Sequence, residues 1–372
     1  MNTPASSGSR PSRGGRSQGH HTNTSSQSNN SNTNSQEHHA GGRRGRVRGG
    51  RGGFMSPAKA ERARLAKETI NTTIPHILSR TPRAKTGVES AVKYTFSEIP
   101  AVVKTVNPHI PKISVVYSDT FDAARDVISR LNPKDYNTGA KRVAVLNMAS
   151  NTTPGGGVLN GSQAQEETLC RRSTLYPSLL QRHFHPLPAG AAVFTSDVLV
   201  FMSQSYEMLK ADERFYVDVI SMAAPKRPEL TKDKKGYAEQ ASYEELISGI
   251  RGMMRVAQAR GVTHFVAGAF GCGAYGNPNA LVAEYFKKVI CGRKFGSEAW
   301  EREEREVWSG VEEVVFAIYG EDRGRGNLAA FETAFADVIK FQEGLNDGQG
   351  ESSDAGGGES SAAGEGSGTQ SV

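Results

Sequence analysis

The sequence has few cysteines and no long apolar run. Only three of the 372 residues are cysteines, Cys170, Cys272 and Cys291, and no two of them form a Cys-x-x-Cys pair. An odd number of widely spaced cysteines argues against a disulfide framework and a zinc site, and it is typical of a reducing compartment. No apolar run approaches the roughly 20 residues that span a bilayer, and no signal-peptide core is visible. We therefore expect an intracellular protein, in the cytoplasm, the nucleus or both, with no membrane contact.

Both ends of the chain lack apolar side chains almost completely. Residues 1–54 contain eight Arg and one acidic residue, whereas residues 343–372 contain six acidic residues and no basic one. Neither segment can bury enough apolar surface to offset its ordering entropy, so we predict two disordered tails. The remaining residues, 55–342, are enough for one large domain with a sizeable core.

The end of the first tail is an Arg-Gly segment, GGRRGRVRGGRGGF at residues 41–54. Guanidinium groups on a flexible chain suit phosphate backbones and can stack on bases. The Arg43–Arg51 stretch is therefore a candidate contact for RNA or another polyanion. A solubilising tail explains the same composition equally well, and it implies no chemistry.

Short apolar strands alternate with amphipathic helices through the middle of the chain, which predicts an α/β fold around a mixed sheet. We expect a first helix over 57–82, interrupted near Pro75. The stretch 192–202 reads as two short strands that meet at Ser196-Asp197. The other predicted strands are 113–118, 143–150, 217–225, 264–270 and 314–320, and the other helices are 119–131, a helix from about 163, 241–261, a helix from 278, and 328–341.

Two glycine-rich loops follow predicted strands at equivalent places. One lies in VLNMASNTTPGGG and the other is GAFGCGAYGNP, residues 268–278. In open α/β sheets, ligands bind beyond the carboxyl ends of the strands, and glycines there let backbone N–H groups approach an anion. Each loop alone could be a tight turn, but the two together favour a clasp around two linked phosphates.

The second loop also contains a GxGxxG pattern, from Gly271 to Gly276. A dinucleotide-binding fingerprint requires in addition a second strand that ends in an acid some 20 residues later. Glu298 lies instead in a polar stretch with no predicted strand before it. The pattern is therefore weak evidence for a nicotinamide enzyme, and the absence of GxxxxGK[ST] leaves a Walker-type triphosphatase without support.

The first loop is part of a longer pattern: three glycines, seven residues, then Gln165-Glu166-Glu167. This combination resembles the signature of poly(ADP-ribose) glycohydrolases, whose catalytic domain is an elaborated macrodomain. The similarity to the microbial type of that family extends over 60–341, through VYSDTFDAAR, TSDVLVF, VISMAAPKRP and GAFGCGAYGNP in the family's order. It implies a macrodomain-like three-layer α/β/α fold with a mixed sheet and an N-terminal helical extension.

The resemblance also implies the site residues. Glu167 is similar to the family's catalytic glutamate, and Glu166 is its neighbour. The implied ADP-ribose contacts are Asn147, Asn151, Gly155, Gly156, Gly157, Val158, Gln165, Gly271, Cys272, Gly273, Ala274, Tyr275 and Gly276. Two positions depart from the pattern, because Tyr275 stands where the family usually has Phe and Thr153 where relatives often have Asn. No metal and no cofactor are implied.

The two adjacent glutamates cannot have the same role, because neighbouring residues on a helix point about 100° apart. A helix N-terminus lowers a carboxyl pKa, whereas a general acid needs a raised one. We therefore expect the working glutamate to be the more enclosed of the two. Glu167 is expected to protonate the departing ribose oxygen and then to deprotonate the attacking water, with ADP-ribose polymer or ADP-ribosylated protein as substrate for a monomeric enzyme. The alternative is a macrodomain that binds ADP-ribose without hydrolysing it.

Overall fold

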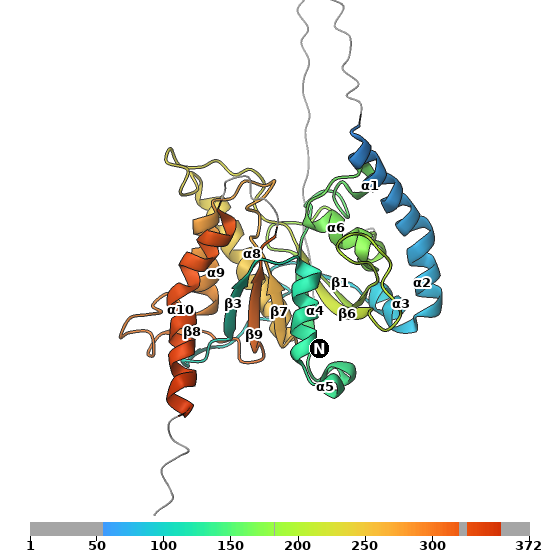
Figure 1. Cartoon of the computed structure of the whole chain (residues 1–372). Helices are drawn as coiled ribbons and strands as arrows, with labels where there is room; N and C mark the ends of the chain where they lie inside the picture. Colours follow the sequence, from blue (N-terminus) through green and yellow to red (C-terminus); the bar gives the residue numbers. More distant parts are fainter. Residues whose placement is uncertain (1–54, 182, 320–325, 351–372) are drawn as a thin grey trace, which may run out of the picture. The chain divides into compact units, whose positions relative to one another are not determined.

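The computed structural model describes residues 55–181, 183–319 and 326–350. Its centre is a seven-stranded mixed sheet (Figure 1). In spatial order the strands are β1 (Val92–Tyr94), β5 (Ala192–Val200), β6 (Phe215–Met222), β4 (Val143–Met148), β7 (His264–Ala267), β9 (Glu313–Ala317) and β3 (Lys112–Val116). The pairs from β6 to β3 are parallel, and β5 is antiparallel to both of its neighbours. The carboxyl ends of β6, β4, β7, β9 and β3 therefore share one edge of the sheet.

Helices cover both faces of this sheet and complete three layers (Figure 1). One face carries α8 (Gln240–Ala259), α9 (Asn279–Ile290) and α10 (Asn327–Gly350). The other carries α1 (Pro57–Glu68), α2 (Ile74–Arg80), α3 (Pro82–Glu89), α4 (Thr120–Arg130), α6 (Gln165–Arg172) and α7 (Leu175–Leu179). The remaining elements are the π-helical turn η1 (Thr69–Thr73), α5 (Pro133–Thr138), the 3-10 turn η2 (Val158–Asn160) and a ribbon of β2 (Lys104–Val106) with β8 (Glu304–Glu306).

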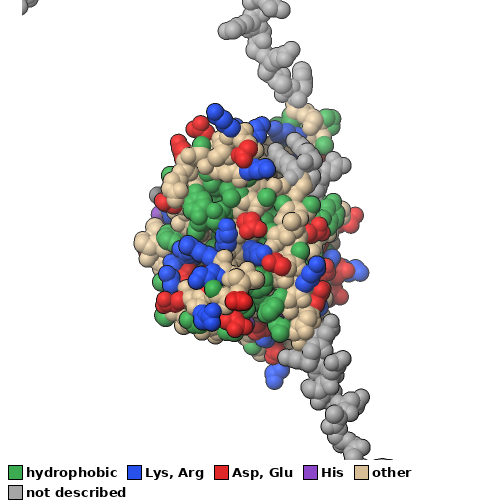
Figure 2. Space-filling view, turned by 90° about the vertical axis from the view of Figure 1, so that its left-hand side faces the viewer, with side chains coloured by type: hydrophobic (Ala, Val, Ile, Leu, Met, Phe, Trp, Pro, Cys, Tyr) green, Lys and Arg blue, Asp and Glu red, His purple; other side chains and the backbone are tan. Residues whose placement is uncertain are grey.

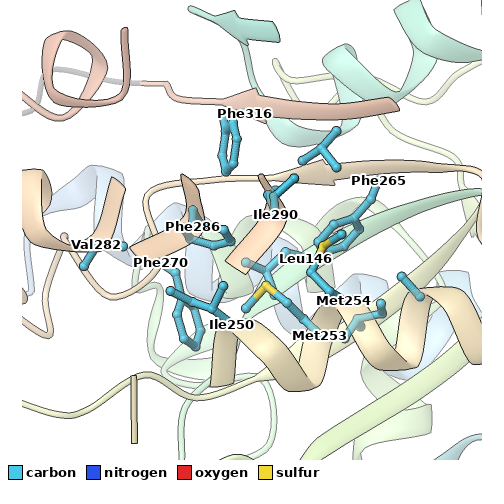
Figure 3. Packing of buried hydrophobic residues seen from close by; sticks show 14 of the residues in the cluster. Leu146, Ile250, Met253, Met254, Phe265, Phe270, Val282, Phe286, Ile290 and Phe316 are labelled. Carbon is cyan, nitrogen blue, oxygen red and sulfur yellow. The ribbon is translucent and has the colours of Figure 1, made fainter. Parts of the chain in front are cut away.

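Alternate residues of the central strand β4 contribute to the apolar clusters on the two faces of the sheet. Leu146 of β4 packs with Phe265 of β7, Met253 of α8 and Phe286 of α9 on one face (Figure 3). Val145, the preceding residue, belongs to the apolar cluster on the opposite face. Successive strand residues point to opposite sides, so a strand buried on both faces is mostly apolar, and the polar residue of β4, Asn147, is buried with a hydrogen bond to Ser221. The predicted three-layer α/β/α fold with a mixed sheet and an N-terminal helical extension is confirmed.

Three local expectations differ from the structure. Residues 192–200 form one strand and not two, because a register shift between Thr195 and Val198 absorbs the polar Ser196-Asp197 pair as a bulge. Helix α6 begins at Gln165, two residues later than expected, since Ala164 is still extended. Helix α10 continues to Gly350, past the expected end at 341.

The interruption near Pro75 is present. The helix changes to the π-helical turn Thr69–Thr73 just before Ile74-Pro75 and then resumes. Proline cannot donate the backbone hydrogen bond of a regular helix, which accounts for the change in pairing at this point.

The predicted tail at 1–54, including Arg43–Arg51, and residues 351–372 of the second tail lie outside the described residues. Within the described ranges, no helix combines the length and the apolar character needed to cross a bilayer. On the face shown in Figure 2, basic and acidic side chains are intermixed, with apolar areas between them.

Candidate active site

The two glycine loops meet at the carboxyl edge of the sheet. They follow β4 and β7, which are parallel neighbours in the sheet. The hydroxyl of Tyr275, from the second loop, accepts a hydrogen bond from the backbone N–H of Asn151 at 3.2 Å and donates to Asn151 Oδ1 at 3.4 Å. The structure therefore brings together the two segments that the sequence places more than a hundred residues apart.

Gln165 connects the start of α6 to the central strand. Its side-chain oxygen accepts the N–H of Met148 at 2.8 Å, and its Nε2 donates to the carbonyl oxygen of Leu146 at 2.6 Å. A further bond of 3.1 Å joins Nε2 to Thr120 Oγ1 at the start of α4. The amide is fully engaged within the protein, so Gln165 positions the helix that carries the glutamates.

Each glutamate accepts a different backbone N–H. Glu166 Oε2 accepts from Ser150 at 2.7 Å, and Glu167 Oε1 accepts from Gly157 at 2.8 Å. Gly156 lies between them with φ +58°, and a Cβ built on it would lie 2.5 Å from Glu167 Oε1 and 2.9 Å from Glu166 Oε2. The carboxylates therefore pack directly against the glycine loop, and a side chain at Gly156 would displace them.

The two glutamates are both buried, but to different degrees. Glu166 is 3% exposed and Glu167 is 7% exposed, and each has one carboxylate oxygen without a hydrogen-bond partner among the described residues. Burial, together with the charge of Glu167, raises the pKa of Glu166 to about 8, although the N–H of Ser150 opposes the shift. Enclosure therefore favours Glu166 as the proton-holding residue, whereas the sequence pattern favours Glu167 as the catalytic one.

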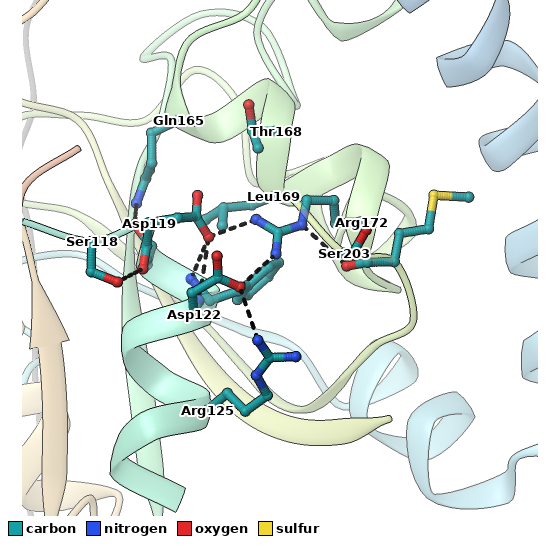
Figure 4. A network of polar contacts seen from close by, with 12 residues as sticks. Ser118, Asp119, Asp122, Arg125, Gln165, Thr168, Leu169, Arg172 and Ser203 are labelled. Carbon is teal, nitrogen blue, oxygen red and sulfur yellow. Dashed lines mark hydrogen bonds and ion pairs between the residues drawn. The ribbon is translucent and has the colours of Figure 1, made fainter. Parts of the chain in front are cut away.

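A buried arginine holds α6 against α4 (Figure 4). Arg172 Nη1 donates to Asp119 Oδ1 at 2.6 Å, and its Nη2 donates to Asp122 Oδ1 at 3.3 Å. Asp119 also caps α4 by accepting the N–H of Phe121 at 2.9 Å. Arg172, the last residue of α6, is 1% exposed, so its guanidinium is shielded from water and holds the end of α6 against the start of α4. The structure therefore gives Arg172 a packing role between α6 and α4.

The other predicted residues lie in the two glycine loops or on the adjoining strand β4. Asn147 is fully buried, donates to Ser221 Oγ at 3.0 Å and helps to lower the pKa of Glu166. Val158 belongs to the apolar core, and the Cys272 side chain is 2% exposed, so both side chains point inward. Gly273 differs, since no atom lies within 4 Å of where a Cβ would stand. The remaining predicted contacts, Gly155, Gly157, Gly271, Ala274 and Gly276, are in the same two loops.

An aromatic pair that no sequence pattern predicted lies at the same edge. Tyr117 follows β3 and Tyr319 follows β9, which are paired in register, and the two ring centroids are 5.6 Å apart. Both side chains are exposed, at 62% and 59%. The sequence could have shown an aromatic residue after each strand, but it could not show that the strands are neighbours.

The raised pKa of Glu166 predicts a pH-dependent stability. Between its ordinary value of 4.5 and about 8 the folded protein holds a proton that the unfolded chain releases, so stability falls as pH rises through this window. Glu166→Gln should remove this dependence and stabilise the protein at pH 8 by on the order of a few kcal/mol. Thermal melting at pH 6 and pH 8 measures the effect. If the variant showed the same difference in melting temperature between pH 6 and pH 8 as the unsubstituted protein, a group other than Glu166 would be responsible for the pH dependence.

Comparisons with known proteins identify a family model and solved structures to which this chain is similar. Residues 79–203 match the family model "Microbial-type PARG, catalytic domain", where PARG denotes poly(ADP-ribose) glycohydrolase. The poly(ADP-ribose) glycohydrolase from Thermomonospora curvata is similar in structure, at 25% identity and a TM-score of 0.57 over 74% of this chain and 100% of that one. Its complex with the inhibitor ADP-HPD gives 26% identity with the same TM-score and coverage.

A second bacterial enzyme shows the same fold. The Deinococcus radiodurans poly(ADP-ribose) glycohydrolase in complex with ADP-ribose has 24% identity and a TM-score of 0.52, over 69% of this chain and 98% of that one. Among curated proteins, no sequence matches this chain. The resemblance to the microbial-type family, drawn first from the glycine and glutamate pattern, is confirmed by the family model and by the Thermomonospora structures.

Proposed function

We propose that this chain, which carries the catalytic domain of the microbial-type poly(ADP-ribose) glycohydrolases, is a glycosidase that hydrolyses ribose–ribose O-glycosidic bonds and releases ADP-ribose. The observation that carries the proposal is the pair of buried glutamates packed on Gly156, beside a second glycine loop at the carboxyl edge. A module that only binds ADP-ribose has no need for two enclosed carboxyl groups beside the same glycine.

The two loops would hold the diphosphate between them. Backbone around Gly273 is open toward solvent, so a phosphate can approach it closely, and the Asn151–Tyr275 contact keeps the loops together. Held in this way, the distal ribose meets the carboxyl groups of α6. Positioning of this kind accounts for a large share of the rate enhancement in enzymes.

Glu167 would be the general acid and base. It protonates the departing ribose oxygen as the glycosidic bond breaks through an oxocarbenium-like state, and it then takes a proton from the water that attacks the anomeric carbon. Its Oε1 is fixed by the Gly157 N–H, which leaves Oε2 for the reacting atoms.

Glu166 would have a supporting role. With a pKa of about 8 it holds a proton at neutral pH, so the glutamate pair does not enter the reaction with two negative charges. Its Oε1 has no partner among the described residues and is available for a ribose hydroxyl. In this scheme Glu166 orients the sugar, while Glu167 transfers the proton.

The Tyr117–Tyr319 pair would bind the base. Its exposed rings lie at the sheet edge that carries both loops, and aromatic faces stack on nucleobases with about 1–3 kcal/mol per base. ADP-ribose would then extend from this pair, across the loops, to the glutamates.

Hydrolysis of labelled poly(ADP-ribose) by the full chain tests the proposal. Release of free ADP-ribose, with no release by the Glu167→Gln variant, is the expected result. Tight binding of the polymer without any release would instead identify a reader of ADP-ribose.

Tyr275→Phe tests the contact between the loops. Loss of the hydroxyl removes two hydrogen bonds to Asn151, and at roughly 0.5–1.5 kcal/mol per bond the affinity for ADP-ribose should fall about 5- to 150-fold. Titration calorimetry gives the value. Unchanged or tighter binding would show that the hydroxyl does not support the clasp.

The proposal includes a monomeric protein whose Arg43–Arg51 segment contacts RNA or another polyanion. That segment lies outside the described residues, and its composition alone supports this part. Replacing its five arginines with glutamine should weaken RNA retention in a mobility-shift assay and leave turnover of short substrates unchanged. If the variant retained RNA as well as the unsubstituted chain does, the segment would serve only as a solubilising tail.

A further inference from the structure

A basic hairpin lies beside the second glycine loop. It follows β6 and comprises residues 226–237, closed by an antiparallel bridge between Leu230 and Tyr237. In Figure 1 it is part of the yellow chain that projects beyond the N-terminal end of α8. Since β6 is parallel to β4, the hairpin leaves the same carboxyl edge as the two loops.

Five basic side chains of this hairpin are exposed and face solvent: Lys226, Arg227, Lys232, Lys234 and Lys235. Only two acidic residues, Glu229 and Asp233, accompany them. The Asp233 carboxylate is used inside the turn, where it accepts from Thr231 Oγ1 at 2.6 Å and from the Lys235 N–H at 3.1 Å. Within the described ranges, none of the five cations forms an ion pair with a carboxylate within 4 Å. The hairpin therefore presents uncompensated positive charge.

The hairpin is fixed to the candidate diphosphate loop at both ends. The Arg227 N–H donates to the carbonyl oxygen of Tyr275 at 2.8 Å, and Lys226 Nζ lies 5.8 Å from the centre of the Tyr275 ring. At the other end, Tyr237 OH donates to Asn277 Oδ1 at 2.7 Å, and Asn277 Nδ2 donates to the carbonyl oxygen of Gly271 at 3.0 Å. These contacts hold the positive charge next to the loop.

Two of the basic residues adopt a backbone conformation that side chains rarely tolerate. Arg227 has φ +51° and Lys234 has φ +59°. Strain of this kind costs on the order of 1–3 kcal/mol per residue and is concentrated at functional sites. A turn that serves only to connect β6 with α8 would not need basic side chains at these two positions.

We infer that the basic hairpin binds the phosphates of the polymer beyond the unit held in the site. The inference rests on the proposed function. One diphosphate occupies the two glycine loops, so five further cations exceed what a single ADP-ribose requires. Each additional unit of the polymer carries another diphosphate, and the exposed basic side chains of a hairpin anchored to the loop attract it. The hairpin thereby favours long chains over short ones.

The test compares long poly(ADP-ribose) with the two-unit oligomer. Lys232, Lys234 and Lys235, at the hairpin tip, are replaced together by glutamine in the full chain. At low salt kcat/KM for the long polymer should fall about 10-fold and its salt dependence should lose a log–log slope of about 2, whereas kcat/KM for the two-unit oligomer, which carries only one diphosphate beyond the unit in the site, should fall by a smaller factor of about 2–3. The matched control replaces Lys85, Lys104 and Lys134, three exposed lysines on other elements, and should leave the ratio between the substrates unchanged.

Thermal melting establishes that both triple variants fold. An equal loss on both substrates, or no loss on either, overturns the inference. The inference is also overturned if the hairpin variant loses affinity for a short single-stranded RNA but keeps its preference for long polymer. The basic hairpin would then be an RNA-binding site. If the unsubstituted chain hydrolyses neither substrate, the proposed function has failed. Binding of the long polymer, compared between the unsubstituted chain and the hairpin variant, then decides the inference by itself.

Discussion

Replacing Glu167 with glutamine is expected to lower kcat for poly(ADP-ribose) by roughly 10³-fold, the contribution typical of a positioned acid and base. Glutamine keeps the shape of the side chain and can still contact the Gly157 N–H, but it can neither donate an acidic proton nor accept one from water. Affinity for ADP-ribose, measured by calorimetry, should stay within about threefold because the loops that hold the ligand are untouched.

Glu166→Gln is the matched comparison. Glutamine resembles the protonated glutamate that a pKa of about 8 predicts at neutral pH, and it can still donate a hydrogen bond to the sugar. We therefore expect a loss of at most roughly 10-fold, much smaller than at Glu167, because no more than one hydrogen bond of about 1.4 kcal/mol is weakened. The reverse order, with the larger loss at Glu166, would exchange the two roles. In that case enclosure, and not the sequence pattern, would identify the catalytic residue.

Gly156→Ala is expected to have the second-largest effect. The new methyl group would stand 2.5 Å from Glu167 Oε1 and 2.9 Å from Glu166 Oε2, so both carboxyl groups must move. Even a shift of about 1 Å can cost 10²-fold in rate, and turnover should fall by at least that factor. The left-handed backbone at φ +58° adds a stability loss of about 1–2 kcal/mol.

Gly261→Ala distinguishes the effect of backbone strain from the effect of displacing the two carboxyl groups. Gly261 has a similar backbone, with φ +67°, but no atom lies within 4 Å of its Cβ position, and it ends α8 away from the glutamates. This variant should lose similar stability in thermal melting while keeping its turnover. If Gly156→Ala kept full turnover as well, the contact between the glycine and the two carboxyl groups would have no functional importance.

The layered fold could be predicted because apolar runs and helical periodicity are local. The stretches at 143–148 and 264–267 are short and mostly apolar, and this pattern indicates strands buried on both faces. The bulge in β5 could not be predicted in this way. A polar Ser196-Asp197 pair looks like a break between two strands, and only pairing with β6 shows that the ladder continues on both sides of it.

The candidate site was predictable to the extent that its residues are close in sequence. The glycines and the two glutamates lie within one strand–loop–helix unit, so their spacing carried the information. The Ser150 N–H on Glu166, the Tyr117–Tyr319 pair and the Arg172 network involve partners that no local pattern connects. Contacts between distant segments depend on strand order, and strand order is a property of the folded chain.

By itself, the sequence determined the α/β class, the family resemblance and the residues that belong to the two loops, because each of these follows from residue types at short spacing. Only the tertiary structure shows that the two glutamates differ in burial, the difference on which the proposed division of acid–base work rests. The pKa of Glu166 depends on burial beneath a loop and on the charge of its neighbour, and both arise when α6 is held against β4. The position of the basic hairpin likewise became visible only in the tertiary structure, because its contacts with the loop after β7 join segments that are distant in the sequence.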